Sequence, residues 1–317
     1  MSRLPLHRIV LPLTAAAAAW AWLHPASLEQ ASLPLFALVM LTTGLPHGAT
    51  DHLVSDLHSG GRTGLLEFLL GYLAAVAGYV LIWVLAPLPG LLLFLAISSW
   101  HFGQSHWLEL PLPEGSRLKQ ALYLTHGAWV LAAVILLQPE TSSDMLAAIL
   151  PQGLPERQTG LLLTAGAAAL HLALLGEGLR RGILGPARLM RALAGMLLLG
   201  LLCWQAPLAV SFALYFGGWH APESIRAEMA VLRSRRPGFG LRDFIRAAVP
   251  FSLISIAGIA LLLAAGIWLQ DRISPWLLFF IAVSALTLPH VWHMNLLYRR
   301  ADGLRSGADR GKIRMLQ

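Results

Sequence analysis

Histidines dominate the residues of this sequence that could do chemistry. Eight of the twelve fall within or at the ends of strongly hydrophobic stretches: His47, His101, His106, His126, His171, His220, His290 and His293. Polar, metal-competent side chains are costly in a membrane, and neutral imidazole is a common ligand of iron, copper and zinc. The pattern therefore predicts a histidine-rich metal site. The single cysteine, Cys203, excludes a site built from several thiolates and any intramolecular disulfide.

Three histidines stand in motifs with other polar residues, glycine or proline. His47 lies in "LPHGATDH", His101 in "SSWHFGQSH" and His220 in "YFGGWHAPES". A fourth motif, "LPHVWH", spaces His290 and His293 three residues apart, so both can face one side of a helix. We predict that His47, His101 and His220 bind the metal ion, whereas His290 is equally well interpreted as a packing residue.

The remaining polar residues have simpler interpretations beside the functional ones. His126 and His171 are best interpreted as packing residues that form hydrogen bonds between helices, and His52 and His58 as ordinary loop residues. Asp51 follows His47 by four residues, so in a continuous helix it could orient that imidazole; Glu223 near His220 is a weaker candidate. Four tryptophans could form an interfacial belt or line a pocket for a long apolar ligand: Trp100, Trp107, Trp219 and Trp292.

The elements that must position these residues are membrane helices. Hydrophobic residues make up 56% of the chain and charged residues 12%, against about a quarter charged in soluble domains. Ten stretches are apolar enough to be candidate spans: 8–23, 31–46, 65–86, 90–107, 119–138, 159–176, 187–203, 207–221, 247–269 and 275–298. Because lipid offers no partner to unpaired backbone groups, we predict an all-α, polytopic transmembrane helix bundle with about 8–10 spans. Residues 1–317 would form one integral membrane domain, with a histidine-motif core at about 40–298 and a basic tail at 299–317.

The basic residues indicate how this bundle is oriented. If the N-terminus is cytoplasmic, all 23 lysines and arginines except Arg157 and Arg272 fall on the cytoplasmic side, as the positive-inside rule requires. Both termini are then cytoplasmic, the protein is multi-pass in the cell inner membrane, and the eight histidines lie toward the cytoplasmic side. The formal charge of +7 is explained by topology and by contact with anionic lipid, so no nucleic acid is expected as a partner.

The histidine motifs resemble those of the Brp/Blh family of membrane β-carotene 15,15′-dioxygenases. The resemblance covers roughly residues 40–298 and rests on "GLPHGATDH", "HFGQ", "THGAWV", "YFGGWH" and "LPH", in that order. It implies an enzyme that holds a non-haem Fe(2+) ion and splits the central double bond of β-carotene, or of a related carotenoid, with O2 to give retinal. A protein that makes retinal would also be expected to have a functional link to a retinal-binding rhodopsin.

The resemblance implies a ligand set that this sequence keeps only in part. His47 matches the histidine of the GLPHG motif, His101 that of HFG, and His220 the first histidine of a His-x-x-x-His motif. The second histidine of that motif falls at Ser224, and a serine hydroxyl is a poor substitute for imidazole on iron. The fourth ligand is then missing, replaced by water or supplied from elsewhere. We expect His290 to complete the site, with His52 and His293 as the other candidates. Residues expected to support the site or its pocket are Asp51, His52, His126, His293, Ser224, Trp100 and Trp219.

Three other classes of protein carry intramembrane histidines. Di-iron desaturases and hydroxylases need HxxxH and HxxHH clusters, and neither occurs in this sequence. A histidine-lined metal or proton transporter would favour acidic residues at mid-depth, and few acids lie in the predicted spans. A bis-histidine haem protein needs facing pairs of histidines, so it stays open from the sequence, and the ultraviolet-visible spectrum of the protein would identify it.

The topology can be tested with reporter fusions. A reporter fused within 138–158 should report the periplasm, because this segment lies on the side that is poor in basic residues. A fusion after residue 300 should report the cytoplasm and serves as the matched control. A cytoplasmic signal from both fusions would contradict the predicted orientation.

Overall fold

The computed structural model describes residues 6–59, 64–268 and 275–314. Thirteen α-helices and two short π-helices form this part of the chain, and it contains no strand. In chain order the elements are α1 (His7–Leu23), α2 (Pro25–Val39), η1 (Met40–Gly44), α3 (Asp51–Ser59), α4 (Leu65–Leu85), α5 (Pro87–Trp107), α6 (Arg117–Leu136), α7 (Pro139–Leu146), α8 (Arg157–Arg180), α9 (Pro186–Gln205), α10 (Leu208–Ala213), η2 (Leu214–His220), α11 (Ala221–Arg235), α12 (Leu241–Trp268) and α13 (Pro275–Arg314).

The all-helical prediction is confirmed, and each of the ten predicted stretches coincides with helix. Six helices among the described residues are long and apolar enough to cross a membrane, or seven if α6 and α7, bent by 91°, count as one span. The sequence predicted about 8–10 spans. The difference arises because α1 has 17 residues, α10 and η2 together are shorter still, and α5 becomes polar from Ser98 onward.

The outer surface of the bundle is apolar. Leu66 of α4 is 70% exposed, Leu162 of α8 is 67% exposed and Leu261 of α12 is 72% exposed, and many other leucines on these helices are exposed too. Soluble monomers rarely expose contiguous apolar surface on this scale. These faces therefore suit contact with lipid.

Helix α5 lies inside the bundle, where it packs against α4, α6 and α13. Its contact with α6 is unusually close because glycines stand where the helices meet. A Cβ atom on Gly103 would lie 1.8 Å from the Tyr123 carbonyl oxygen, and one on Gly127 would lie 1.9 Å from that of Ser99. Glycine lets helix backbones approach in this way, and the approach brings His101 and His106 of α5 close to residues of the neighbouring helices.

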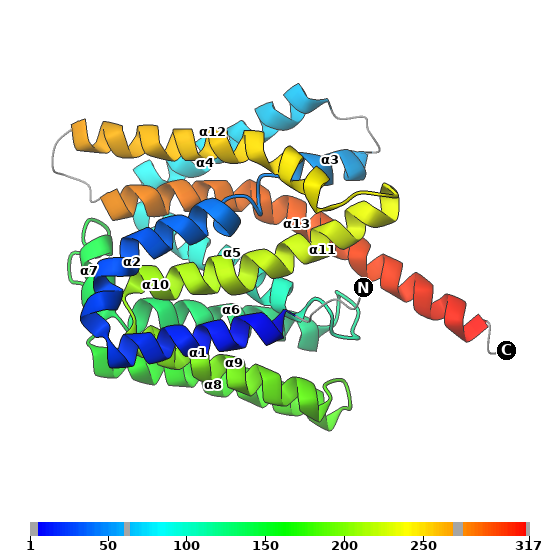
Figure 1. The fold of residues 1–317 in the computed structure, drawn as a ribbon, viewed down its shortest axis with the longest axis horizontal. Helices are drawn as coiled ribbons and strands as arrows, with labels where there is room; N and C mark the ends of the chain where they lie inside the picture. Colours follow the sequence, from blue (N-terminus) through cyan, green and yellow to red (C-terminus); the bar gives the residue numbers. More distant parts are fainter. Residues whose placement is uncertain (1–5, 60–63, 269–274, 315–317) are drawn as a thin grey trace.

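Figure 1 shows most helices running side by side along the long axis, with the C-terminal part of α13 projecting beyond the others. Helices α2, α5, α10 and α13 begin at one end of the bundle, near α7. The histidine motifs lie away from this end, because His101 is late in α5, His47 and His220 follow α2 and α10, and His290 is four turns into α13. We call the opposite end, which carries Arg188, Arg226 and Arg236, the basic end.

Candidate metal centre

Three buried histidines converge inside the bundle. Ligand nitrogens of His47, His101 and His220 all lie within 4.8 Å of one another. His47 stands in the turn after η1, His101 lies late in α5, and His220 is the last residue of η2. Segments far apart in the sequence therefore bring three imidazoles to one point, as the motifs predict.

The fourth imidazole, from His290 of α13, closes this group. Its ring centroid lies 4.7 Å from that of His47 and 5.0 Å from that of His101. The other two neighbouring pairs, His47 with His220 and His101 with His220, are 5.2 and 4.7 Å apart. The four rings meet at interplanar angles between 77° and 85°. This closed arrangement suits one metal ion.

Hydrogen bonds fix which nitrogen of each ring is available. The Nδ1 of His47 donates to the carbonyl oxygen of Gly44, which can only accept. The Ser105 hydroxyl donates to the Phe102 carbonyl at 2.9 Å, so it accepts from the Nδ1 of His220, also at 2.9 Å. Both rings therefore turn an unprotonated Nε2 toward the centre.

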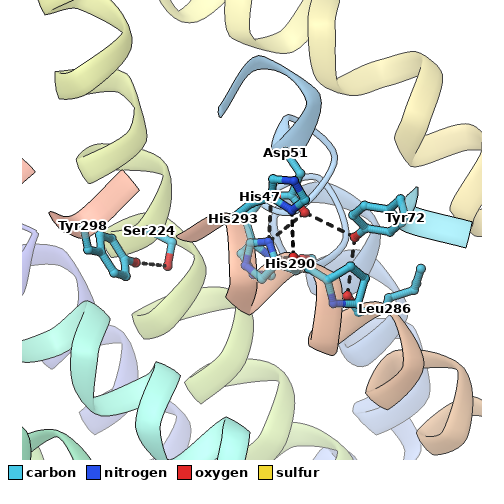
Figure 2. A network of polar contacts seen from close by, with 10 residues as sticks. His47, Asp51, Tyr72, Ser224, Leu286, His290, His293 and Tyr298 are labelled. Carbon is cyan, nitrogen blue, oxygen red and sulfur yellow. Dashed lines mark hydrogen bonds and ion pairs between the residues drawn. The ribbon is translucent and has the colours of Figure 1, made fainter. Parts of the chain in front are cut away.

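His290 is oriented in the same way by a carboxylate. Its Nδ1 donates to Asp51, with nitrogen–oxygen distances of 2.9 and 3.2 Å. The hydroxyl of Tyr72 in turn donates to Asp51 at 3.2 Å, and the Leu286 carbonyl lies 3.4 Å from that hydroxyl (Figure 2). Metal-bound histidines usually direct their second nitrogen at such an acceptor, which sets the tautomer and strengthens the ligand.

The residues present fit a metal ion. Within the described part of the chain, Nε2 of His47, His220 and His290 and both ring nitrogens of His101 are buried without a hydrogen-bond partner. An unsatisfied buried polar group costs about 1–3 kcal/mol, and whole domains are stable by only about 5–15 kcal/mol. A cation held by these lone pairs would remove that cost.

Asp51 does not orient His47, as the sequence suggested, because the helix is interrupted between them. Residues 45–50 form turns, and Asp51 is the first residue of α3. Its carboxylate therefore faces α13 and binds His290. Glu223, the weaker candidate near His220, instead lies 3.4 Å from Nδ1 of His106.

The other candidate residues surround the centre at different places. Ser224 is fully buried, and its hydroxyl lies 3.3 Å from that of Tyr298, away from the Asp51–His290 network (Figure 2). His293 donates from Nδ1 to the Pro289 carbonyl and packs against Tyr72. His52 packs on Phe251 of α12, and His126 belongs to a separate group with His106 and His171. His52, His126 and His293 are therefore not brought into the group of four.

A cavity of about 670 Å³ leads to the four histidines. It begins at the end of the bundle near α7, with Pro25, Gln138 and Trp276 among its lining residues. Fifteen residues of α13 separate Pro275 from His290, or about 22 Å of helix. The aromatic residues along the cavity are Phe36, Phe94, Phe102, Phe212, Phe216, Phe279 and Phe280, with Tyr72 and Trp276. The cavity therefore suits a long apolar molecule that reaches the histidines.

The tryptophans beside the histidine motifs do not line this cavity. Trp107 and Trp219 are buried elsewhere, Trp100 donates to Asn295, and Trp292 is 69% exposed. Trp100 and Trp219 are not among the residues that line the large cavity, whereas Trp219 lines a second, smaller cavity. The cavity is lined by phenylalanines of the hydrophobic stretches, which composition alone does not distinguish from packing residues.

Sequence reasoning also missed the residues that orient the ligands. Ser105 lies four residues after His101 in the same quoted motif, and this spacing places both on one face of α5. Tyr72 lies in a hydrophobic stretch that carries no motif. Only its position in space, next to Asp51, indicates its role.

Glu228 is a buried acid two turns beyond His220 on α11. Burial raises the pKa of Glu228 to about 8. The group is therefore mostly protonated at neutral pH and adds no anionic ligand to the centre.

The fold and the site together define an all-helical membrane protein with a buried histidine centre in the wall of an apolar cavity. Residues 38–298 match the model of the family described as Beta-carotene 15,15′-dioxygenase. The chain belongs to this family, and family membership implies a carotenoid-cleaving dioxygenase.

Two curated relatives resemble most of the chain. The probable beta-carotene 15,15′-dioxygenase Blh of Halobacterium salinarum is 26% identical over 278 residues, which cover 78% of this chain and 79% of the relative. A beta-carotene 15,15′-dioxygenase from an uncultured marine bacterium is 27% identical over 269 residues, which cover 81% and 90%. No solved structure matches the chain.

The ligand assignment predicts a clear loss of metal on substitution. His101→Ala should lower the metal content of the purified protein to a small fraction of that of the unmodified chain, because one ring nitrogen of His101 lies within 4.8 Å of ligand nitrogens of His47 and His220 and has no hydrogen-bond partner among the described residues. The measurement is metal per chain by elemental analysis. His24→Ala is the matched control, since His24 is exposed between α1 and α2. Equal metal content in the two variants would contradict the assignment.

The fourth ligand can be tested through Ser224. His290→Ala should lower metal content, and adding Ser224→His should restore part of it only when Tyr298→Ser is also present. The reason is that the hydroxyls of Ser224 and Tyr298, both fully buried, are in contact, so an imidazole needs the space of the phenol ring. Full metal occupancy in His290→Ala would show that His290 is not a ligand.

Proposed function

We propose that this protein cleaves the central double bond of β-carotene, or of a closely related carotenoid, with O2 to give two molecules of retinal. The observation that carries the proposal is the group of four imidazoles, three with oriented lone pairs, in the wall of an apolar cavity. Family membership supports the reaction class, and the names of the two relatives support β-carotene as the substrate.

The proposed metal is Fe(2+), held by His47, His101, His220 and His290. Imidazole binds iron as well as copper and zinc, and the choice of iron rests on the resemblance of the motifs to the Brp/Blh family. When bound, the ion would supply redox chemistry and open coordination positions for dioxygen. The chain itself supplies the orientation of the imidazoles through Gly44, Ser105 and Asp51.

The cavity determines how the polyene lies. Its apolar walls hold an extended hydrocarbon in one direction and exclude water from the reacting bond. One half of the polyene would lie between the α7 end of the bundle and the histidines. The other half would continue past them beside Gly48, Ala49, Tyr72 and Ser255, which also line the cavity. This placement would put a central bond, rather than an end, next to the imidazoles.

The reaction needs no other reactant from the protein. One carbon–carbon double bond and the O–O bond are broken, and two aldehyde C=O bonds form, so both oxygen atoms of O2 enter the products. No proton or external electron is consumed. The reaction therefore needs no proton donor beside the histidines. The acidic side chains that line the cavity, Glu29 and Asp144, lie at the end far from the histidines, which is compatible with this requirement.

The proposed location is the cell inner membrane, with both termini in the cytoplasm. The support is the distribution of lysine and arginine along the chain together with the six to seven candidate spans. In this orientation the centre lies toward the cytoplasmic side, and carotenoid reaches the cavity from the bilayer without crossing water.

Co-expression in bacteria that accumulate β-carotene tests the proposal. Cells that express the unmodified chain should lose their orange colour and form retinal, measured by chromatography of extracted pigments. The His101→Ala variant should leave β-carotene intact, and His24→Ala should behave as the unmodified chain. An unchanged carotenoid profile in cells that contain the folded, metal-loaded protein would overturn the proposed reaction.

A further inference from the structure

A second group of histidines lies outside the four-histidine centre, and the proposed function does not use it. His106 of α5, His126 of α6 and His171 of α8 surround part of a separate cavity of about 290 Å³. The ring centroids of His106 and His126 are 4.2 Å apart, and those of His126 and His171 are 5.2 Å apart. These separations resemble those of the first centre.

Two of these imidazoles are buried and have ring nitrogens that form no hydrogen bond with any described residue. His126 is 5% exposed and His171 is fully buried. Within the described residues, both ring nitrogens of His126 and Nε2 of His171 have no hydrogen-bond partner. Each such atom is costly unless something in the cavity satisfies it.

The tautomer of His171 identifies what that partner must be. The Thr125 hydroxyl donates to the Ala121 carbonyl at 2.7 Å, so it accepts from Nδ1 of His171 at 2.9 Å. Nε2 of the neutral ring is then a lone pair directed at the cavity. A lone pair attracts a metal ion or an N–H or O–H donor, and it repels an anion. Ser105 fixes His220 in the same way in the first centre.

The charges around the cavity favour a cation next to the histidines. The Glu223 carboxylate lies 3.4 Å from Nδ1 of His106. Of the arginines that line the mouth, Arg226 forms an ion pair with Glu109 at 2.9 Å, and Arg188 lies over the Trp107 ring and donates to the Glu109 carbonyl. A third arginine, Arg191, also lines the cavity. Glu223 is the charged group in direct contact with one of these imidazoles, and carboxylate with imidazole is a common ligand set for divalent transition metals.

We propose that His106, His126, His171 and Glu223 form a second binding site for a divalent transition-metal ion. The site is weaker than the first. His106 and His126 are stacked at an interplanar angle of 10°, so their nitrogens do not meet at one point, and His106 must turn to bind. Its side chain is 18% exposed, which leaves it room to do so.

The position of this site adjoins the first centre. Ser105, whose hydroxyl orients His220, also lines the second cavity. The mouth of that cavity lies at the basic end, between α1, α9 and α11. The second site would therefore hold a metal ion between the surface and the wall of the catalytic centre, whereas the apolar cavity opens toward the opposite end.

Titration of the metal-free, detergent-solubilised protein with Co(2+) tests this proposal. Visible absorption of Co(2+) reports imidazole coordination, and equilibrium dialysis gives the number of ions bound. The unmodified chain should bind two ions, one at least tenfold more weakly than the other. His126→Ala and His171→Ala should each keep the tight ion and lose the weak one, while His101→Ala should lose the tight ion. His24→Ala should bind two.

Retention of the tight ion shows that the variants are folded, so a loss of the weak ion is specific. A single ion in the unmodified chain, removed by His101→Ala, would overturn the second site and leave the proposed function intact. Two ions in both His126→Ala and His171→Ala would also overturn it. Two ions as expected, without carotenoid cleavage, would support the second site and contradict the proposed function.

Discussion

The central constraint on this structure is that the helix bundle buries several imidazoles. At least one ring nitrogen of each has no hydrogen-bond partner among the residues that the structure describes. In three of the four rings at the centre, one nitrogen is oriented as a ligand because an acceptor takes the proton of the other nitrogen. Gly44 provides this acceptor for His47, Ser105 for His220 and Asp51 for His290. The three acceptors are a backbone carbonyl, a hydroxyl whose own proton is engaged and a carboxylate, and each belongs to a different segment. The fold therefore orients the ligands, and a bound metal ion would satisfy the nitrogens that the fold leaves without a partner.

The two π-helices are part of this preparation. Each introduces an extra residue per turn, a feature that is frequent at functional sites, and each carries or directly precedes a histidine of the centre. They pack against one another, and the Thr43 hydroxyl lies 2.8 Å from the Gly217 carbonyl. A Cβ atom on Gly217 would lie 2.2 Å from Val39. The close contact of η1 with η2 thus fixes the distance between His47 and His220, which are far apart in the sequence.

Much of this could be predicted from the sequence, and the rest fails for identifiable reasons. Long apolar stretches reveal helices because lipid requires them, and histidines beside glycine or proline indicate the centre. The partner of Asp51 could not be predicted, because periodicity assumes a continuous helix through residues 45–50, and those residues form turns. Tyr72 and the phenylalanines of the cavity carry no local signal, since their role arises only when distant helices meet. The packing interpretation of His126 and His171 treated each alone, whereas the structure places them together around one cavity.

The serine at position 224 shows how one helix face can accommodate a departure from the family pattern. Leu286, His290, Met294 and Tyr298 recur every four residues on α13, and so share a face. The Leu286 carbonyl lies 3.4 Å from the Tyr72 hydroxyl, His290 joins the four imidazoles, and Tyr298 fills the space beside Ser224 and stacks near His101 at 6.3 Å. A histidine at 224 would compete with Tyr298 for the same volume. The small side chain of Ser224 leaves room for the buried Tyr298 ring beside it, and the same face of α13 also brings His290 next to His47 and His101.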